Sequence, residues 1–372
     1  MVLVTLVGAA SIYAGKKDYL ASSAPHDYSV AGNKVDLTST KKLMDDFLIK
    51  TGEQANEEVA VSYLFFGIKN QETNKLTVFT KNERKVVPKS IVLVFSQETF
   101  KQLTGKELNL SSNQIALYTK NKTLKTQKSL SIDGKNYQIH RQLGDFINKK
   151  IPNIYKIIVS DYSYLVVPDI KIFESSMKGT SIAQATYVGV NVKDPTHDAK
   201  KNSDLLDQMT DKETQQLARQ TTGVSQSYLT ANSQYDTEGM LNGFVGGTFF
   251  IGIFLSIIFM LGTVLVIYYK QISEGYEDRE RFVILQKIGL DDLQVKQTIR
   301  KQVLTVFFLP LIFAFIHLAF AYHMISLIVR IIGVLNPDLM LVVTIIVCGV
   351  FFLAYVLVFV LTSRSYRRIV SM

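Results

Sequence analysis

The residue pattern with the clearest chemical role lies in a charged stretch between two long uncharged runs. Phe282, Leu285 and Ile288 recur at helical spacing within Lys270–Lys301 and stop at Gly289, which predicts a short helix with one apolar face. Such a face must be buried against lipid headgroups or against a partner protein. The stretch holds seven basic and six acidic residues. Because anionic headgroups would favour a strongly basic helix, we expect a protein partner.

The motifs of catalysis and of metal binding are absent from the sequence. There is no Gly-x-x-x-x-Gly-Lys-[Ser/Thr] pattern, so we expect no nucleotide to be held by a P-loop. The Gly-x-Ser-x-Gly, His-Glu-x-x-His and paired-cysteine patterns are missing too, and the 5 histidines are scattered. We therefore predict a chain that is not an enzyme and has no catalytic residue, metal or cofactor of its own. Its net charge of +9 comes without a recognition motif, so we also expect no nucleic-acid partner.

Uncharged runs separate the chain into membrane and water-exposed parts. Residues 239–269, 302–329 and 339–363 are free of charge over 31, 28 and 25 positions, and each run is long enough for a helix to cross a bilayer. The first run, 1–15, is too short to cross and lacks the basic start of a signal peptide. We interpret it as a truncated transmembrane helix that Lys16 and Lys17 close at the membrane surface.

The charges between these runs predict an orientation. Seven Lys and Arg residues lie in 270–301 and three Arg residues in the tail 364–372, whereas the turn 330–338 has Arg330 alone. Positive charge in short loops stays on the cytoplasmic side, which makes 270–301 and the C-terminus cytoplasmic. The segment 16–238 is then extracellular in a multi-pass protein of the plasma membrane.

The segment 16–238 mixes helical and strand-like patterns, so we predict an extracellular α+β domain on an α-helical transmembrane bundle. A helix should end at Gly52, Asp133-Gly134 should form a hairpin turn, and 203–220 should be a surface helix. Six runs favour strands: 59–66, 76–80, 91–95, 115–118, 155–159 and 185–192. The segment has 30 basic and 25 acidic residues and no cysteine, which fits a Gram-positive surface better than a disulfide scaffold.

The uncharged runs contain glycine and proline residues that could allow the predicted transmembrane helices to bend or to pack closely. Gly239, Gly243 and Gly247 share one helical face, which would let another helix approach closely or would loosen the joint to the outer domain. Pro310 should kink the second long run because it removes a backbone donor. His317 lies mid-run, where a neutral imidazole bonded to a neighbouring helix is the favoured interpretation.

The charged stretch and its surroundings resemble a known family. Residues 280–289, ERFVILQKIG, are similar to the segment that FtsX-like permeases, the membrane subunits of ABC transporters, carry after a membrane span. The strings ISEGYED at 272–278, FFLPL at 307–311 and IHL at 316–318 resemble the Gram-positive bacitracin-resistance branch, the BceB-type permeases. One span, a large outer domain and three further spans are similar to the C-terminal part of those ten-span proteins, so we expect a fragment of a longer permease.

The resemblance implies a mechanism and partners. A separate ABC ATPase, working as a dimer that holds ATP and Mg²⁺, would dock on 274–292 and drive the outer domain through the spans. Phe282, Leu285 and Ile288 would enter its groove, with Arg279, Glu280 and Arg281 at the rim. The other residues expected to couple to the ATPase are Glu274, Glu277 and Gly289. In that branch the outer domain is linked to cell-wall-targeting peptide antibiotics or to lipid pyrophosphate, and the permease signals to a sensor histidine kinase. Two alternatives are a permease for lipid or lipoprotein handling or cell division, and a non-transporting surface receptor.

Overall fold

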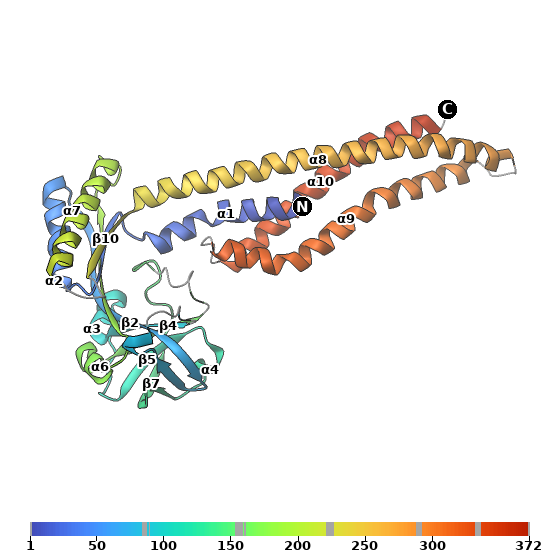
Figure 1. Cartoon of the computed structure of the whole chain (residues 1–372). Helices are drawn as coiled ribbons and strands as arrows, with labels where there is room; N and C mark the ends of the chain where they lie inside the picture. Colours follow the sequence, from blue (N-terminus) through green and yellow to red (C-terminus); the bar gives the residue numbers. More distant parts are fainter. Residues whose placement is uncertain are drawn as a thin grey trace. The chain divides into compact units, whose positions relative to one another are not determined.

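The computed structural model describes residues 2–83, 88, 90–152, 159, 161–220, 227–287, 292–331 and 336–370. The chain divides into two compact units. A helical unit combines Met1–Asp18 with Leu241–Met372, and a soluble unit comprises Tyr19–Met240. Each unit is described by itself below (Figure 1).

The soluble unit is built on a ten-stranded sheet within the described residues, in the order β10-β1-β9-β2-β3-β6-β7-β5-β8-β4. An additional pairing of β2 with β4 closes seven of these strands into a ring. The strands are β1 (Tyr28–Asn33), β2 (Ala55–Glu72), β3 (Lys75–Val78), β4 (Ser90–Ser96), β5 (Gln114–Thr119), β6 (Ser129–Ile132), β7 (Lys135–Gln142), β8 (Asp161–Val167), β9 (Ala183–Val192) and β10 (Tyr228–Ser233).

The long strand β2 joins the ring to an open sheet. Its first part pairs with β9 from Ala55 to Phe65, and its last part pairs with β4 on one edge and with β3 on the other. Alternate residues of the ring strands, such as Phe66, Val94 and Leu117, are at most 1% exposed and fill the ring interior. Residues of opposite parity, such as Tyr164, pack outside the ring in a second cluster rich in aromatic side chains.

Helices α2 (Leu37–Thr51) and α7 (Ala199–Gln220) cover the open sheet and bury a third cluster with β1 and β9 (Figure 1). Asp36 starts α2 by accepting a hydrogen bond from the Ser39 amide at 2.9 Å. Gly52 ends it with a φ of 72°, a left-handed conformation that favours glycine. Shorter helices complete the unit: η1 (Lys81–Glu83), α3 (Gln97–Thr104), α4 (Lys122–Lys125) and α6 (Ile170–Ser176).

Several predictions for this unit are confirmed. The helix ends at Gly52, and Asp133 and Gly134 turn between the antiparallel strands β6 and β7 with φ values of 47° and 82°. The predicted surface helix lies within α7, and five of the six predicted strands lie in or overlap β2, β3, β4, β5 and β9. The sixth, 155–159, falls almost wholly outside the described residues. The sequence pattern missed β1, β8 and β10.

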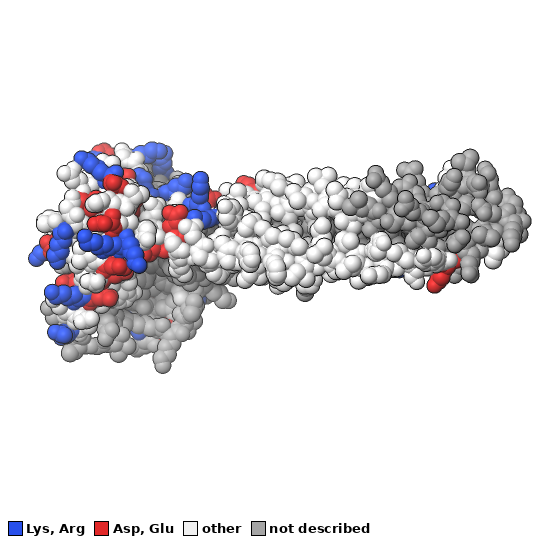
Figure 2. All heavy atoms as spheres, turned by 90° about the horizontal axis from the view of Figure 1, so that it is seen from above, with Lys and Arg blue, Asp and Glu red and all other residues white. Residues whose placement is uncertain are grey.

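The helical unit contains most of α1 (Val2–Ser23) and of α8 (Gln234–Lys287), together with α9 (Asp292–Ile331) and α10 (Pro337–Val370). Three helices fit the predicted spans, because Gln234–Lys270, Phe308–Arg330 and Pro337–Val360 are long and apolar enough to cross a membrane, with mean hydropathies of 2.8, 2.1 and 3.0. Figure 2 shows blue and red side chains gathered over the soluble unit and mainly white atoms along the described helices.

Two helices extend further than the charge pattern predicted. The first helix does not stop at Lys16 and Lys17 but continues to Ser23, because lysine is a good helix former and the first strong breaker is Pro25. The first long span and the apolar stripe of 270–301 are not separated by a break, since α8 is one helix of 54 residues up to Lys287.

Candidate functional site

The predicted coupling segment lies at the end of α8. The helix includes seven of its residues: Glu274, Glu277, Arg279, Glu280, Arg281, Phe282 and Leu285. Ile288 and Gly289 lie outside the described residues. Positions three apart share one face of a helix, so 282 and 285 keep the spacing of the predicted stripe. Tyr276 at the start of the segment is 59% exposed, so this helix presents a large side chain that its own unit does not bury.

The three glycines of the predicted packing face all lie in α8. A Cβ atom at Gly239, Gly243 or Gly247 would meet nothing within 4 Å in the described structure. Their role in packing or as a hinge therefore stays a prediction. Pro310 lies inside α9, and the kink expected there stays a prediction.

The close approach of two helices occurs elsewhere on α8. A Cβ atom added to Gly252 would lie 2.8 Å from the Cβ of Ala9 in α1. Next to it, the rings of Tyr13 and Phe249 stack at 5.0 Å, and Lys16 donates a hydrogen bond to Asn242. This seam between α1 and α8 was missed by the sequence analysis. The sequence signals for this seam were Gly252 in one uncharged run and several small residues in the N-terminal run.

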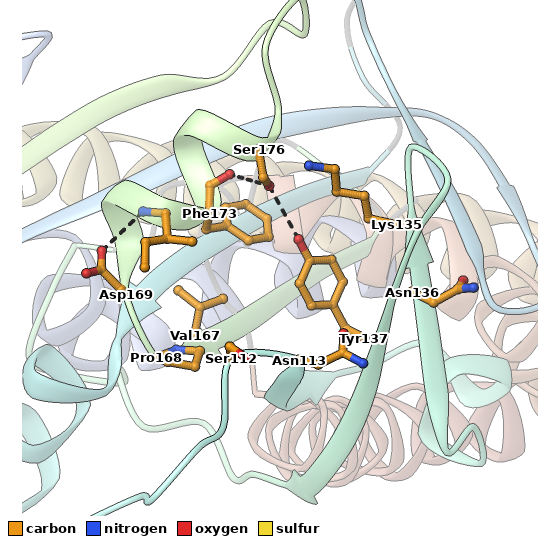
Figure 3. A pocket seen from close by; sticks show the side chains of 11 residues that line it. Ser112, Asn113, Lys135, Asn136, Tyr137, Val167, Pro168, Asp169, Phe173 and Ser176 are labelled. Carbon is orange, nitrogen blue, oxygen red and sulfur yellow. Dashed lines mark hydrogen bonds between the residues drawn. The ribbon is translucent and has the colours of Figure 1, made fainter.

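The soluble unit has a pocket of about 500 Å³ between α6 and the β6–β7 hairpin (Figure 3). Tyr137 and Phe173 form an aromatic wall with ring centroids 5.8 Å apart, and the Tyr137 hydroxyl lies 3.5 Å from Ser176 Oγ. Ile172 is 65% exposed at this pocket. The remaining lining residues are Ser112, Asn113, Lys135, Asn136, Val167, Pro168 and Asp169.

The charges of the pocket are balanced. Among the described residues that line it, Lys135 is the one basic and Asp169 the one acidic residue. One carboxylate oxygen of Asp169 already accepts the Lys171 amide at 2.7 Å and the Ile172 amide at 3.2 Å, which starts helix α6. The pocket therefore combines an apolar wall with amide and hydroxyl groups, a composition that suits a ligand with one apolar group and a polar backbone.

Of the basic residues in the soluble unit, Arg84, Lys85 and Lys89 fall outside the described residues, and Lys120 lies 5.1 Å from the ring centroid of Tyr162. Among the described residues no three His, Cys, Asp or Glu side chains gather as metal ligands would.

Comparison with known proteins identifies similar permeases. No protein-family profile matches the chain. It is 36% identical over 72 residues to the ABC transporter permease protein YxdM of Bacillus subtilis, 30% over 121 residues to the ABC transporter permease YvcS, and 29% over 140 residues to the bacitracin export permease protein BceB of the same organism. These stretches cover 19%, 32% and 38% of the chain, and 12%, 18% and 19% of the relatives. The resemblance to ABC transporter permeases is thereby confirmed.

A solved structure from Bacillus anthracis aligns with 47% of the chain and 92% of its own length, at 12% identity. Its TM-score of 0.25 is too low to carry an argument about fold.

Proposed function

We propose that the chain is part of the permease of an ABC transporter, FtsX-like in type, that converts ATP hydrolysis in a partner ATPase into motion of its soluble unit. The observation that carries this proposal is the continuity of α8, which begins directly after β10 of the sheet and ends in the coupling segment. Because α8 has no break between these points, a displacement of the coupling segment is carried along the helix as far as the predicted hinge glycines, Gly239, Gly243 and Gly247. The similarity to three Bacillus permeases supports the same conclusion.

The proposed topology places 270–301 and 364–372 in the cytoplasm and 16–238 outside the cell. The basic residues of the short loops support it. A chain with Cys348→Ser and a single new cysteine tests it. With Gln216→Cys, which lies on the exposed surface of α7, a membrane-impermeant maleimide should label intact cells. With Glu277→Cys, also exposed, labelling should require permeabilised cells, and the reverse pattern would overturn the topology.

The docking of an ATPase is tested by co-purification. Phe282→Asp and Leu285→Asp place a charge on the stripe that the partner groove would bury, so each change should abolish capture of the ATPase from membranes. Ile49→Asp is the matched control, since the same change falls on a side chain that is 78% exposed in the soluble unit. Capture retained by both coupling-segment variants would sink the proposal.

For the ligand, we infer a cell-wall-targeting peptide antibiotic such as bacitracin, with its lipid pyrophosphate target as the second candidate. The balanced charge of the α6 pocket supports a peptide, because a pyrophosphate would require several cations, whereas Lys135 is the one cation among the described lining residues. We further propose that the permease gives resistance to such peptide antibiotics and that it signals their presence to a sensor histidine kinase. Deletion of the gene should sensitise cells to bacitracin-like peptides. Unchanged sensitivity with altered division or lipoprotein content would favour the alternative permease roles, and function independent of any ATPase would favour a receptor.

A further inference from the structure

The junction between the sheet and α8 contains a closed hydrogen-bond network. Ser233 ends β10 and Gln234 begins α8, so strand and helix join without an intervening residue. The Asp236 amide donates to Ser233 Oγ at 3.0 Å, and Ser233 Oγ donates to Asp236 Oδ2 at 2.8 Å. This reciprocal arrangement caps the first turn of the helix with its own strand.

Helix α7 joins the same network. Ser203 Oγ lies 2.7 Å from Ser233 Oγ and also donates to Asp236 Oδ2, and Ser203 and Ser233 are each 2% exposed. Further along α7, Thr214 Oγ1 accepts the Leu229 amide at 3.0 Å and donates to the Leu229 carbonyl at 3.2 Å. Two hydroxyl contacts therefore fasten α7 alongside the edge strand β10, where a bare edge would otherwise expose its backbone groups.

A second contact set connects α1. Asn232 Nδ2 donates to the carbonyl of Ser23, the last residue of α1, at 3.3 Å. The carbonyl oxygen of the same Asn232 side chain accepts from Thr237 Oγ1 in α8 at 2.8 Å. One side chain of β10 thus contacts the end of one helix and the first turn of another.

From these contacts we infer that Ser203, Ser233 and Asp236 form a junction clasp that makes α7, β10 and the first turn of α8 move as one body. Asp236 is its central positioning residue, because its carboxylate accepts from both serines and also lies in the first turn, where negative charge is favourable. The two serines are buried although Asp236 itself is exposed, so breaking these contacts leaves desolvated hydroxyl groups without a partner, and this cost fixes the relative orientation of the elements. The idea that the clasp transmits nucleotide-driven motion rests on the proposed function. The existence of the clasp does not depend on that function.

The clasp also predicts where α8 can bend relative to the soluble unit. Its last residue is Asp236, and the predicted hinge glycines begin at Gly239, where an added Cβ would meet open space. Movement between the helix and the soluble unit is therefore expected after the clasp rather than within it.

The test measures how tightly α7 is held to α8 in the full chain in lipid nanodiscs, without an ATPase. Cys348→Ser supplies a cysteine-free background, and spin labels at Lys212→Cys and Met240→Cys, both exposed, report the distance distribution between the two helices. Ser203→Ala and Asp236→Leu should at least double the width of that distribution. Asp236→Asn should restore it, because the amide oxygen can still accept from both serines.

Thr210→Val is the matched control, because Thr210 is a buried residue of α7 whose hydroxyl has no hydrogen-bond partner in the described structure. It should leave both the melting temperature and the distribution close to those of the parent, because it removes a buried hydroxyl that makes no hydrogen bond. Distributions of Ser203→Ala and Asp236→Leu that superimpose on the parent would overturn the clasp, as would an Asp236→Asn distribution as broad as that of Asp236→Leu. Since no ATPase is present, loss of ATPase docking elsewhere leaves this result unaffected.

Discussion

The two units of the molecule treat their large apolar side chains in opposite ways. In the soluble unit Phe47 and Phe95 are 0% exposed and lie in packed clusters. In the helical unit Phe254 is 55% exposed and Leu353 is 68% exposed, and only 0–17% of the residues in each apolar window are buried by the protein itself. The soluble unit is therefore stabilised by its own core, whereas the helical unit needs lipid to cover it.

This difference determines where a mutation is costly. A truncation destabilises the soluble unit when it removes a buried side chain, while a charge disrupts the helical unit even at its most exposed positions. Within the soluble unit, at the start of α8, the junction clasp uses a polar network where the core clusters use apolar packing.

The largest effect is expected from Phe47→Ala. Phe47 is fully buried in α2 and its ring lies 5.0 Å from that of Tyr28, so its loss should lower the free energy of unfolding by about 3–5 kcal/mol. Ile49→Ala, on the same helix but 78% exposed, should change it by less than about 0.5 kcal/mol. Urea titration followed by tyrosine fluorescence measures both, since the chain has 18 Tyr and no Trp. Equal losses in the two variants would contradict the assigned core.

A crossed pair of substitutions compares the units directly. Ile345 in α10 is 62% exposed and Ile49 in the soluble unit is 78% exposed, so exposure alone predicts equal tolerance of aspartate. We expect Ile345→Asp to oppose membrane insertion by about 3 kcal/mol, because the charge would face hydrocarbon, and Ile49→Asp to be neutral. A protease-protection assay for the C-terminal span gives the inserted fraction. Normal insertion of the Ile345→Asp chain would mean that this helix does not face lipid.

A smaller loss should follow from Gly189→Ala in β9. The added Cβ would lie 2.5 Å from Nδ1 of His26, a side chain that is 3% exposed, so the strand or the ring must shift at a cost of about 1–3 kcal/mol. Gly144→Ala is the control, because nothing lies within 4 Å of its Cβ. The difference in melting temperature between the two variants measures the effect, and an unchanged Gly189→Ala protein would show that this part of the core has spare room.

The smallest effect concerns pH. Burial lowers the pKa of His26 below its ordinary value of 6.5, against the opposing influence of Glu57 and Asp27. The folded state therefore binds fewer protons than the unfolded state just below that pH, so stability present above 6.5 is lost as the pH falls, by at most about 1.4 kcal/mol per pH unit.

Melting curves between pH 7.5 and 5.5, a range of about two pH units around the ordinary histidine pKa, test this dependence. Substitution of His26 by Gln should flatten the decline, because it removes the group that must take up the proton. The same change at the exposed His140 should leave the decline as it is. A decline that persists unchanged in the His26→Gln protein would assign it to other groups.

Local signals predicted the elements that depend on neighbouring residues. The stop at Gly52 and the turn at Asp133-Gly134 require positive φ, and the three helices long enough to cross a membrane follow from uncharged length, so each could be inferred from one continuous stretch of sequence. The strands β1 and β10 could not be inferred in this way, because Tyr28–Asn33 and Tyr228–Ser233 have no strong alternation and pair with each other across about 200 residues.

In the candidate site, too, some features could be predicted from local sequence and others could not. The stripe at 282 and 285 came from helical spacing, but the continuity of α8 was hidden by the change from uncharged to charged residues, which alters solvation without breaking a helix. The pocket at α6 and the junction clasp bring together residues far apart in the chain, such as Ser203 and Ser233 or Tyr137 and Phe173, and no local pattern encodes such contacts.

The central claim is that α8 carries nucleotide-driven motion from the coupling segment to the soluble unit. Hydrogen exchange of the chain in nanodiscs with its ATPase, compared between ATP and ADP, tests it most directly. We predict a nucleotide-dependent change in protection of β10 and α7 that disappears in the Phe282→Asp chain. Identical exchange of β10 and α7 in both nucleotide states, while the bound ATPase hydrolyses ATP, would contradict the account.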